Sequence, residues 1–366
     1  MARRLRKVFV ATATLAVAAA GGLGASVLGL PLPWLLGSLI GTALLAVSGL
    51  RIAGKPPAFP ERIRLAAVPV IGVMIGAGVS ADVFSALGQW WPSLLLLVPF
   101  ILALQLVNFA VFHRLGGYDL PTAFFAASPG GLIESVLIGE SRGGTVALMS
   151  MQHFSRIALS VLIIPVLFTF VTGQSVGSAA GASLAAPENG SLTVRDAVLL
   201  AASGLVGTVA GRALRLPAAI MIGPFLASAA IHAGGLTNAS VPTVLVMAAQ
   251  VILGLGIGLR FVGQGRCTLA HGFGLALVAL SLSLGLAGLI AIALSASGIA
   301  TPEAVFLAFA PGGLAEMSLI AISLGISPVF VTTHHVLRIV IAISLSSLVF
   351  RLVCAVLNRR GRMPRA

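Results

Sequence analysis

The sequence has few charged residues. Asp, Glu, Lys and Arg make up 8% of its 366 residues, whereas apolar residues make up 58%. In a water-soluble domain roughly a quarter of the residues are charged, so this chain has too few charged residues to cover a surface that faces water. Its apolar runs are close to the roughly 20 residues that a helix needs to cross a bilayer. We therefore predict an all-α polytopic membrane protein.

Cysteine and acidic residues are also scarce. The two cysteines, Cys267 and Cys354, lie in different segments without a ligand spacing, so they indicate neither a disulfide framework nor a thiolate metal site. The 22 Lys and Arg against 9 Asp and Glu give a net charge of +13. These basic residues gather between apolar segments, where they report orientation in a membrane rather than nucleic-acid contacts. The expected partners are the lipid bilayer and a small-molecule solute, without direct nucleic-acid binding, cofactor or metal.

An internal repeat organises the chain. The motif Pro-Gly-Gly-Leu-x-Glu occurs at residues 129–134 and again at 311–316, a shift of 182 positions. A His-x-x-Arg motif follows both copies at the same distance, and near the beginning Leu30-Pro31 matches Leu216-Pro217. Self-similarity of this kind is typical of a duplicated unit. We predict two membrane repeats, 1–172 and 195–366.

The segment between the repeats has a different composition. Residues 173–194 are rich in Gly, Ser and Ala and contain neither Lys nor Arg, which is typical of a linker. The basic start of the chain followed by a short apolar run resembles a signal peptide. However, the apolar segment 8–28 corresponds to segment 197–213 of the second repeat, so we interpret it as a retained helix.

Each repeat contains six apolar segments. In the first repeat they are 8–28, 32–50, 65–79, 94–112, 120–139 and 145–171. The fifth holds Pro-Gly-Gly near its middle, where proline removes a backbone donor and glycine weakens helix propensity. We expect a broken or re-entrant helix there.

The distribution of arginine favours an inverted arrangement. If all six segments cross the bilayer in each repeat, five arginines fall on the outside: Arg142, Arg212, Arg215, Arg260 and Arg266. If the fifth segment returns to its own side, each repeat has about five crossings and only Arg195 among the basic groups lies outside. An odd number of crossings inverts the second repeat, as in many secondary transporters. This topology places both termini in the cytoplasm. We expect the protein to lie in the inner membrane of the cell.

Six ionisable residues lie in apolar surroundings in two matching sets: Glu134, His153 and Arg156, and Glu316, His335 and Arg338. Such charges are costly in a bilayer unless they face one another, water or a ligand. The candidate substrate- or ion-binding residues are Pro129, Gly130, Gly131, Glu134, His153 and Arg156 with Pro311, Gly312, Gly313, Glu316, His335 and Arg338. No catalytic residue is proposed.

Two interpretations of these sets remain open. In the functional one, the arginines hold an anionic group while the glutamates and histidines exchange protons or bind a cation. In the structural one, each glutamate pairs with an arginine and fixes the broken helix to its neighbour. Other polar residues are weaker candidates and are more typical of contacts between helices: Gln105, Asn108, Gln250, His271 and His334.

The paired Pro-Gly-Gly-Leu-x-Glu and His-x-x-Arg motifs resemble the bacterial AbrB-like membrane protein family, over the full length of the chain. Members of that family carry the labels ammonia monooxygenase and regulator of gene expression. An oxygenase needs clustered metal ligands, whereas the six histidines here are scattered. A regulatory role would be indirect, because no segment is typical of a DNA-reading domain.

The sequence favours a secondary transporter or exporter of a small anionic or zwitterionic solute that works by alternating access, with coupling to protons or cations as one option. Indirect regulation of gene expression is the alternative, and the monooxygenase label is a weaker one. The oligomeric state is open, with a homodimer as one option.

Overall fold

The computed structural model describes residues 2–79, 88–172, 192–216, 218–295 and 298–359. Its regular structure in these ranges is helical, apart from one isolated bridge between Ile52 and Lys55. In chain order the helices are α1 (Ala2–Val27), α2 (Pro33–Ser48), α3 (Glu61–Ala77), α5 (Trp91–Ala110), η1 (Val111–Leu115), α6 (Leu120–Ala126), α7 (Leu132–Ser141), α8 (Val146–Thr172), α9 (Val194–Ala213), α10 (Ala219–Ala233), α11 (Thr243–Gly258), η2 (Leu259–Phe261), α12 (Arg266–Ser295), α13 (Pro302–Phe309), α14 (Leu314–Ser323) and α15 (Pro328–Arg359). Most of the predicted linker, residues 173–191, lies outside the described residues.

The helices confirm an all-α polytopic membrane protein. Within the described residues, seven helices are long and apolar enough to cross a membrane. The second segment of each half is shorter, with 16 residues in α2 and 15 in α10. At 1.5 Å per residue these two helices are about 24 and 22 Å long, less than the roughly 30 Å of a hydrocarbon core. The number of true crossings and the inversion of the second half stay predictions.

The fifth apolar segment of each half is broken into two short helices, as its Pro-Gly-Gly motif predicts. In the first half α6 has 7 residues and α7 has 10. In the second half α13 has 8 residues and α14 has 10. Each piece is only about 10 to 15 Å long, so none of the four can cross a bilayer alone. Both breaks therefore place free helix ends inside the protein.

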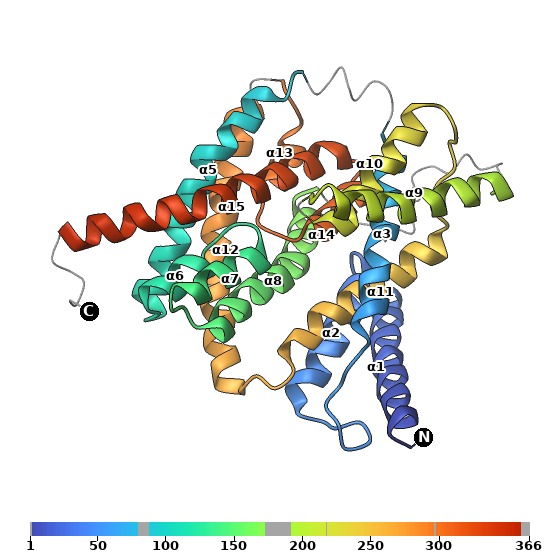
Figure 1. Cartoon of the computed structure of the whole chain (residues 1–366), viewed down its shortest axis with the longest axis horizontal. Coiled ribbons are helices and arrows are strands. Elements are labelled where there is room, and N and C mark those ends of the chain that lie inside the picture. Colours follow the sequence, from blue (N-terminus) through green and yellow to red (C-terminus); the bar gives the residue numbers. More distant parts are fainter. Residues whose placement is uncertain (1, 80–87, 173–191, 217, 296–297, 360–366) are drawn as a thin grey trace.

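The helices form two packing groups (Figure 1). Group A contains α1, α2 and α3 with α9, α10 and α11, and group B contains α5 to α8 with α12 to α15. In group A, α2 packs against α11 and α3 packs against α10, and in group B, α8 packs against α12 and α5 against α15. Each group thus draws helices from both halves of the sequence, and the two predicted repeats are interleaved in space.

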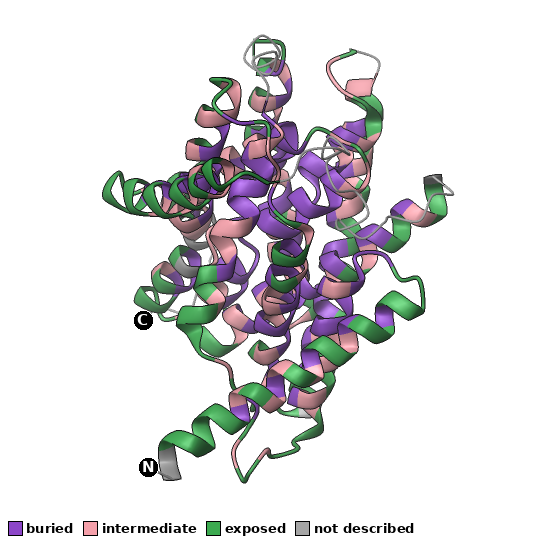
Figure 2. Cartoon of the chain, turned by 90° about the vertical axis from the view of Figure 1, so that its right-hand side faces the viewer, coloured by how far each residue is buried: buried purple, intermediate pink, exposed green. Residues whose placement is uncertain are grey.

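The outside of the molecule is apolar, as a surface that faces lipid must be. Buried residues concentrate at the centre, whereas the peripheral helices are widely exposed (Figure 2). Large apolar side chains such as Phe170, Val194 and Ile292 are among the exposed ones. A soluble monomer rarely exposes contiguous apolar surface on this scale. This distribution agrees with a bilayer as the surrounding solvent.

Glycine allows the two sequence halves to pack closely in group A. A Cβ atom at Gly254 of α11 would collide with the carbonyl oxygen of Leu35 in α2. A Cβ atom at Gly72 of α3 would likewise lie 2.5 Å from the carbonyl oxygen of Met221 in α10. Small residues let membrane helices approach at backbone distance, where packing holds them together. These contacts join each half to the other.

We expect Gly254→Ala to destabilise the protein and Gly274→Ala to stabilise it slightly. Alanine at 254 forces α2 and α11 apart, an overpacking cost of about 2 kcal/mol. A Cβ atom at Gly274, within α12, would have nothing within 4 Å, so alanine there gains about 0.5 to 1 kcal/mol of helix propensity. Thermal unfolding of both variants in the same detergent provides the measurement. Equal midpoints for the two would contradict the close approach of α2 and α11.

Candidate functional site

The first break is shaped by its own serines and glycines. The Ser128 and Ser135 hydroxyls both donate to the Gly130 carbonyl oxygen, at 3.0 and 3.1 Å. Gly131 has a φ of +63°, in the left-handed region that glycine adopts without strain. α7 begins directly after it, with no side-chain cap on its first amide groups. The sequence therefore ends one short helix and starts another within five residues.

Arg156 and His153, on α8, hold the end of α6. The Arg156 guanidinium donates to the Ser128 carbonyl oxygen at 2.7 Å and to Nδ1 of His153 at 3.3 Å. Because arginine can only donate, Nδ1 accepts and the proton of the neutral ring lies on Nε2. Nε2 then donates to the carbonyl oxygen of Phe125 at 3.0 Å. His153 is fully buried, and both of its ring nitrogens are used.

The same contacts occur in the second half, 182 positions later. The Arg338 guanidinium donates to the Ala310 carbonyl oxygen at 2.7 Å and to Nδ1 of His335 at 3.1 Å. Nε2 of His335 contacts the carbonyl oxygen of Leu307 at 3.1 Å. Arg338 also donates to the carbonyl oxygen of Gly312 at 3.1 Å. Each His-x-x-Arg motif therefore holds the broken helix that precedes it in its own half.

These contacts have a clear physical reason. The last carbonyl groups of a helix have no partner within the helix, and the helix dipole makes that end negative. In a bilayer, water is not at hand to satisfy them, and each unsatisfied group costs several kcal/mol. A guanidinium provides both the donors and the positive charge. The arginines are thus accounted for by the helix ends that the Pro-Gly-Gly breaks create.

The glutamates lie at the opposite ends of the breaks, at the starts of α7 and α14. The Glu316 carboxylate folds back over Gly313, so that a Cβ atom at Gly313 would collide with it. Oε2 of Glu134 similarly lies 3.2 Å from the position of a Cβ at Gly131. A negative charge in the first turn is favourable because the helix N-terminus is positive. Glu316 is only 8% exposed, whereas Glu134 is exposed.

The predicted pairing of glutamate with arginine is not present. Among the described residues, an ion pair joins Arg64 to Glu61 at 2.5 Å, and neither Glu134 nor Glu316 is in salt-bridge contact with an arginine. The reason is that each break separates its charges: arginine goes to the carbonyl end of one short helix and glutamate to the amide end of the next. The structural alternative is wrong in that form, although the arginines do fix the broken helices.

The long helices α8 and α15 of group B each contact the breaks of both halves. The Ser160 hydroxyl, on α8, donates to the Pro311 carbonyl oxygen of the second break at 2.6 Å. The backbone of Gly130 in the first break packs against α15, where a Cβ atom would lie 3.0 Å from Cα of Ile339. Pro311 of the second break and Gly130 of the first thus each contact a long helix of the other half.

Each arginine keeps one buried donor unused. The Nε atoms of Arg156 and Arg338 have no hydrogen-bond partner among the described residues. Arg338 is only 2% exposed, so its N–H is shielded from bulk water. Buried polar groups in native proteins nearly always have partners. Two buried cationic donors without a partner make this region suitable for a small anion.

Several polar residues that the sequence treats as weaker candidates connect helices. The Gln105 amide donates to the Phe124 carbonyl oxygen at 2.6 Å, and the Ser283 hydroxyl donates to Oδ1 of Asn108 at 3.3 Å. His334 contacts Ser93 at 2.9 Å. Ser160 is missed by the sequence interpretation, because a serine in an apolar helix gives no signal of its own. Within the described part of the chain, no three His, Cys, Asp or Glu residues are placed to hold a metal ion.

The comparison with known families agrees with the motifs at this site. The family described as transition state regulatory protein AbrB matches residues 42–354, a range that contains both Pro-Gly-Gly breaks and both His-x-x-Arg motifs. The chain belongs to the AbrB family. The resemblance inferred from the repeated motifs is confirmed.

Two relatives show how far the AbrB-family similarity extends. The chain is 28% identical over 357 residues to "Uncharacterized protein YhjN" of Bacillus subtilis (strain 168), covering 93% of this chain and 92% of that protein. It is 27% identical over 238 residues to "Putative regulator AbrB" of Escherichia coli (strain K12), covering 64% and 65% of the two chains. The first similarity spans both halves of the AbrB-family chain.

Proposed function

We propose that this AbrB-family protein is a secondary transporter or exporter of a small anionic or zwitterionic solute. The observation that carries the proposal is that α8 and α15 join two broken helices, each held by an arginine whose Nε–H is buried and unused. Broken helices that meet near the middle of a membrane protein are the usual substrate and ion sites of secondary transporters. The solute's anionic group would bind at the arginines and the free amide ends of α7 and α14.

The residues divide into distinct roles. Arg156 and Arg338 bind the anionic group and keep the helix ends together. His153 and His335 are positioning residues, because both ring nitrogens of each are occupied by an arginine and a carbonyl oxygen. Glu316, which is buried at the start of α14, is the candidate for carrying a proton or a cation.

A cavity in group B lies between the start of α13 and the end of α14. Its volume is about 530 Å³, and its lining includes Trp90, Thr301, Glu303 and Phe330. The Phe330 ring lies against the ring of His334, with centroids 4.1 Å apart, and His334 directly precedes His335 in α15. A solute in the cavity would be separated from the break by the length of the 8-residue α13, about 12 Å.

The division into two helix groups supports alternating access. Contacts between the groups involve α2, α3, α11 and η2 on one side with α8, α14 and α15 on the other. Group B contains both breaks, so the binding region lies within a single group. Movement of one group against the other would expose that region to either side of the membrane while the hydrogen bonds of the arginines persist.

The alternative is an indirect role in the regulation of gene expression. The name of the Escherichia coli relative describes that protein as a regulator. A transporter that changes the concentration of a signalling solute would produce such an effect. Flux into proteoliposomes, screened with labelled organic anions and zwitterions, tests the proposal directly. Absence of flux together with a transcriptional change in a deletion strain would favour the regulator.

We also propose that the protein lies in the inner membrane with both termini in the cytoplasm. This topology predicts that cysteines at positions 142 and 195 react with a membrane-impermeant maleimide from opposite sides. Both positions are exposed arginines. The two native cysteines are first replaced, as Cys267→Ser and Cys354→Ala, because the exposed Cys267 would itself react with the maleimide. We expect Arg195→Cys to react in intact cells and Arg142→Cys only after lysis. Reaction of both in intact cells would overturn the five-crossing topology.

A further inference from the structure

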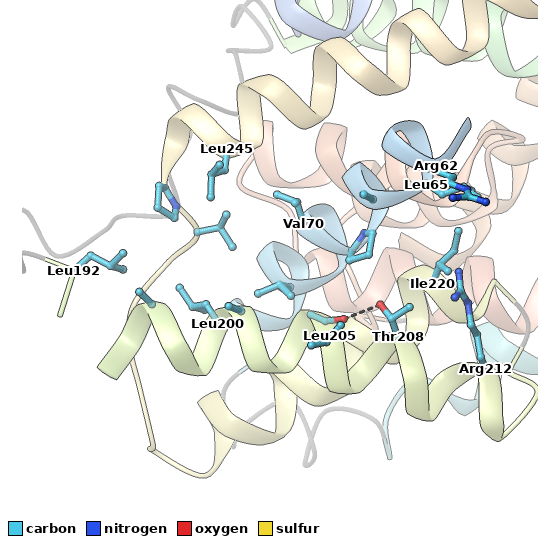
Figure 3. A pocket seen from close by; sticks show the side chains of 18 residues that line it. Arg62, Leu65, Val70, Leu192, Leu200, Leu205, Thr208, Arg212, Ile220 and Leu245 are labelled. Atoms are coloured by element: carbon cyan, nitrogen blue, oxygen red, sulfur yellow. Dashed lines mark hydrogen bonds between the residues drawn. The ribbon is translucent and has the colours of Figure 1, made fainter. Parts of the chain in front are cut away.

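A groove of about 630 Å³ runs along the outside of group A (Figure 3). Residues from α3, α9, α10 and the start of α11 line it, so both halves of the sequence contribute. Most of its lining is apolar, including Leu65, Val70, Leu200, Leu205 and Leu245. It lies apart from the two breaks, which belong to group B.

Two arginines stand at one end of this groove. Arg62 comes from the first turn of α3 and Arg212 from the last turn of α9, and both lie beside Ile220 (Figure 3). Neither side chain has a hydrogen bond or an ion pair with another residue that the structure describes. Both are exposed. The groove thus has a cationic end whose charges are not neutralised by neighbouring acidic groups.

The threonine in the body of the groove offers a ligand no free hydroxyl donor. The Thr208 hydroxyl donates to the carbonyl oxygen of Gly204 within its own helix, at 2.7 Å. Apart from Thr208 and the two arginines, the residues that line the groove are apolar. A ligand that fits must combine a long apolar part with an anionic head at one end.

We propose that this groove binds one anionic phospholipid, with its phosphate between Arg62 and Arg212 and an acyl chain along α3 and α9. Guanidinium groups recognise phosphate through paired N–H donors. Basic pockets between membrane helices on the cytoplasmic side are typical sites for anionic head groups. The predicted topology places both arginines on that side. A lipid bound here contacts helices of both halves and holds them together.

The test compares lipids that share acyl chains but differ in head group. Purified protein in neutral detergent is mixed with phosphatidylglycerol or phosphatidylcholine, and native mass spectrometry measures retained lipid. We expect retention of one phosphatidylglycerol, weakened about 30-fold in R62Q/R212Q, since each surface arginine contributes about 1 kcal/mol to anionic lipid binding. The matched control is R114Q/R351Q, which removes two exposed arginines outside the groove.

A second variant tests the apolar part of the site. Gly204 lines the groove, and the nearest atom to a Cβ there is the Val73 side chain at 3.5 Å, so Gly204→Leu fills the groove without a backbone collision. It should displace the lipid while both arginines remain. An equal loss of retained phosphatidylglycerol in R114Q/R351Q would show general charge attraction and overturn the proposal. Competition by inorganic phosphate alone, or undiminished retention in Gly204→Leu, would also overturn it.

Discussion

Replacing Arg338 with glutamine is expected to abolish solute flux and to lower thermal stability more than other single polar substitutions in the protein. Arg338 is nearly fully buried and donates to the Ala310 and Gly312 carbonyl oxygens and to His335. A hydrogen bond to a charged group contributes about 1.5 to 3 kcal/mol, and glutamine can replace only part of this set. We expect a loss of about 3 kcal/mol and at least a tenfold lower uptake.

The control for this result lies on the same helix. Arg351→Gln makes the same change at an exposed position of α15, so it should leave flux and the unfolding midpoint unchanged. Because Arg338→Gln could unfold the protein, Arg338→Lys is measured beside it. Lysine keeps the charge but is a point donor that cannot bridge two carbonyl oxygens and a histidine in one plane. Normal flux in a folded Arg338→Gln protein would contradict the assignment of this arginine to the solute.

Glutamine at position 316 is expected to remove the dependence of uptake on a proton or cation gradient. The Glu316 carboxylate is buried beside the start of α14, where it can release or bind a cation as its surroundings change. Glutamine keeps the shape and an acceptor oxygen near the helix amides. Only the charge at the helix end is lost, at a cost of about 0.3 to 1 kcal/mol. We therefore expect a folded protein that exchanges solute but no longer accumulates it.

The matched control for Glu316→Gln is Glu134→Gln, its counterpart in the first half. Glu134 is exposed, so we expect its replacement to change gradient-driven uptake by less than about twofold, since exposed charges interact weakly. Flux is measured with and without an imposed gradient for both variants. If the two substitutions have equal effects, the burial of Glu316 does not decide the coupling site, and that part of the proposal fails.

The contrast between these glutamates shows where sequence interpretation stops. In the sequence, Glu134 and Glu316 occupy identical positions in two copies of one motif, so nothing separates their roles. Their burial differs because it depends on which helices of the other half cover them. For example, α14 also contacts α3 of group A. The repeated motif carries no information about such neighbours from other parts of the chain.

The sequence does predict features that depend on local chemistry. Apolar segments of helix length correspond to helices in both halves, because a bilayer requires backbone hydrogen bonds within each segment. Pro129 and Pro311 predict the two breaks, because proline and glycine weaken a helix at that point. The sequence does not predict which groups the two arginines bind. Opposite charge favours Glu134 and Glu316 as the partners of Arg156 and Arg338. In the structure the arginines instead donate to the carbonyl groups that the breaks leave free at the ends of the short helices.

The interleaving of the two halves has a consequence for the synthesis of the chain. When residues 1–172 have left the ribosome, α2 and α3 present glycine-lined and backbone surfaces whose partners, α11 and α10, have not yet been made. The first half must therefore wait in the bilayer as an incomplete unit. Its packing in group A is completed only when translation has passed residue 258, the end of α11, and α8 and α5 wait longer still for α12 and α15. Truncation before that point would leave a membrane-inserted intermediate that quality-control proteases can recognise.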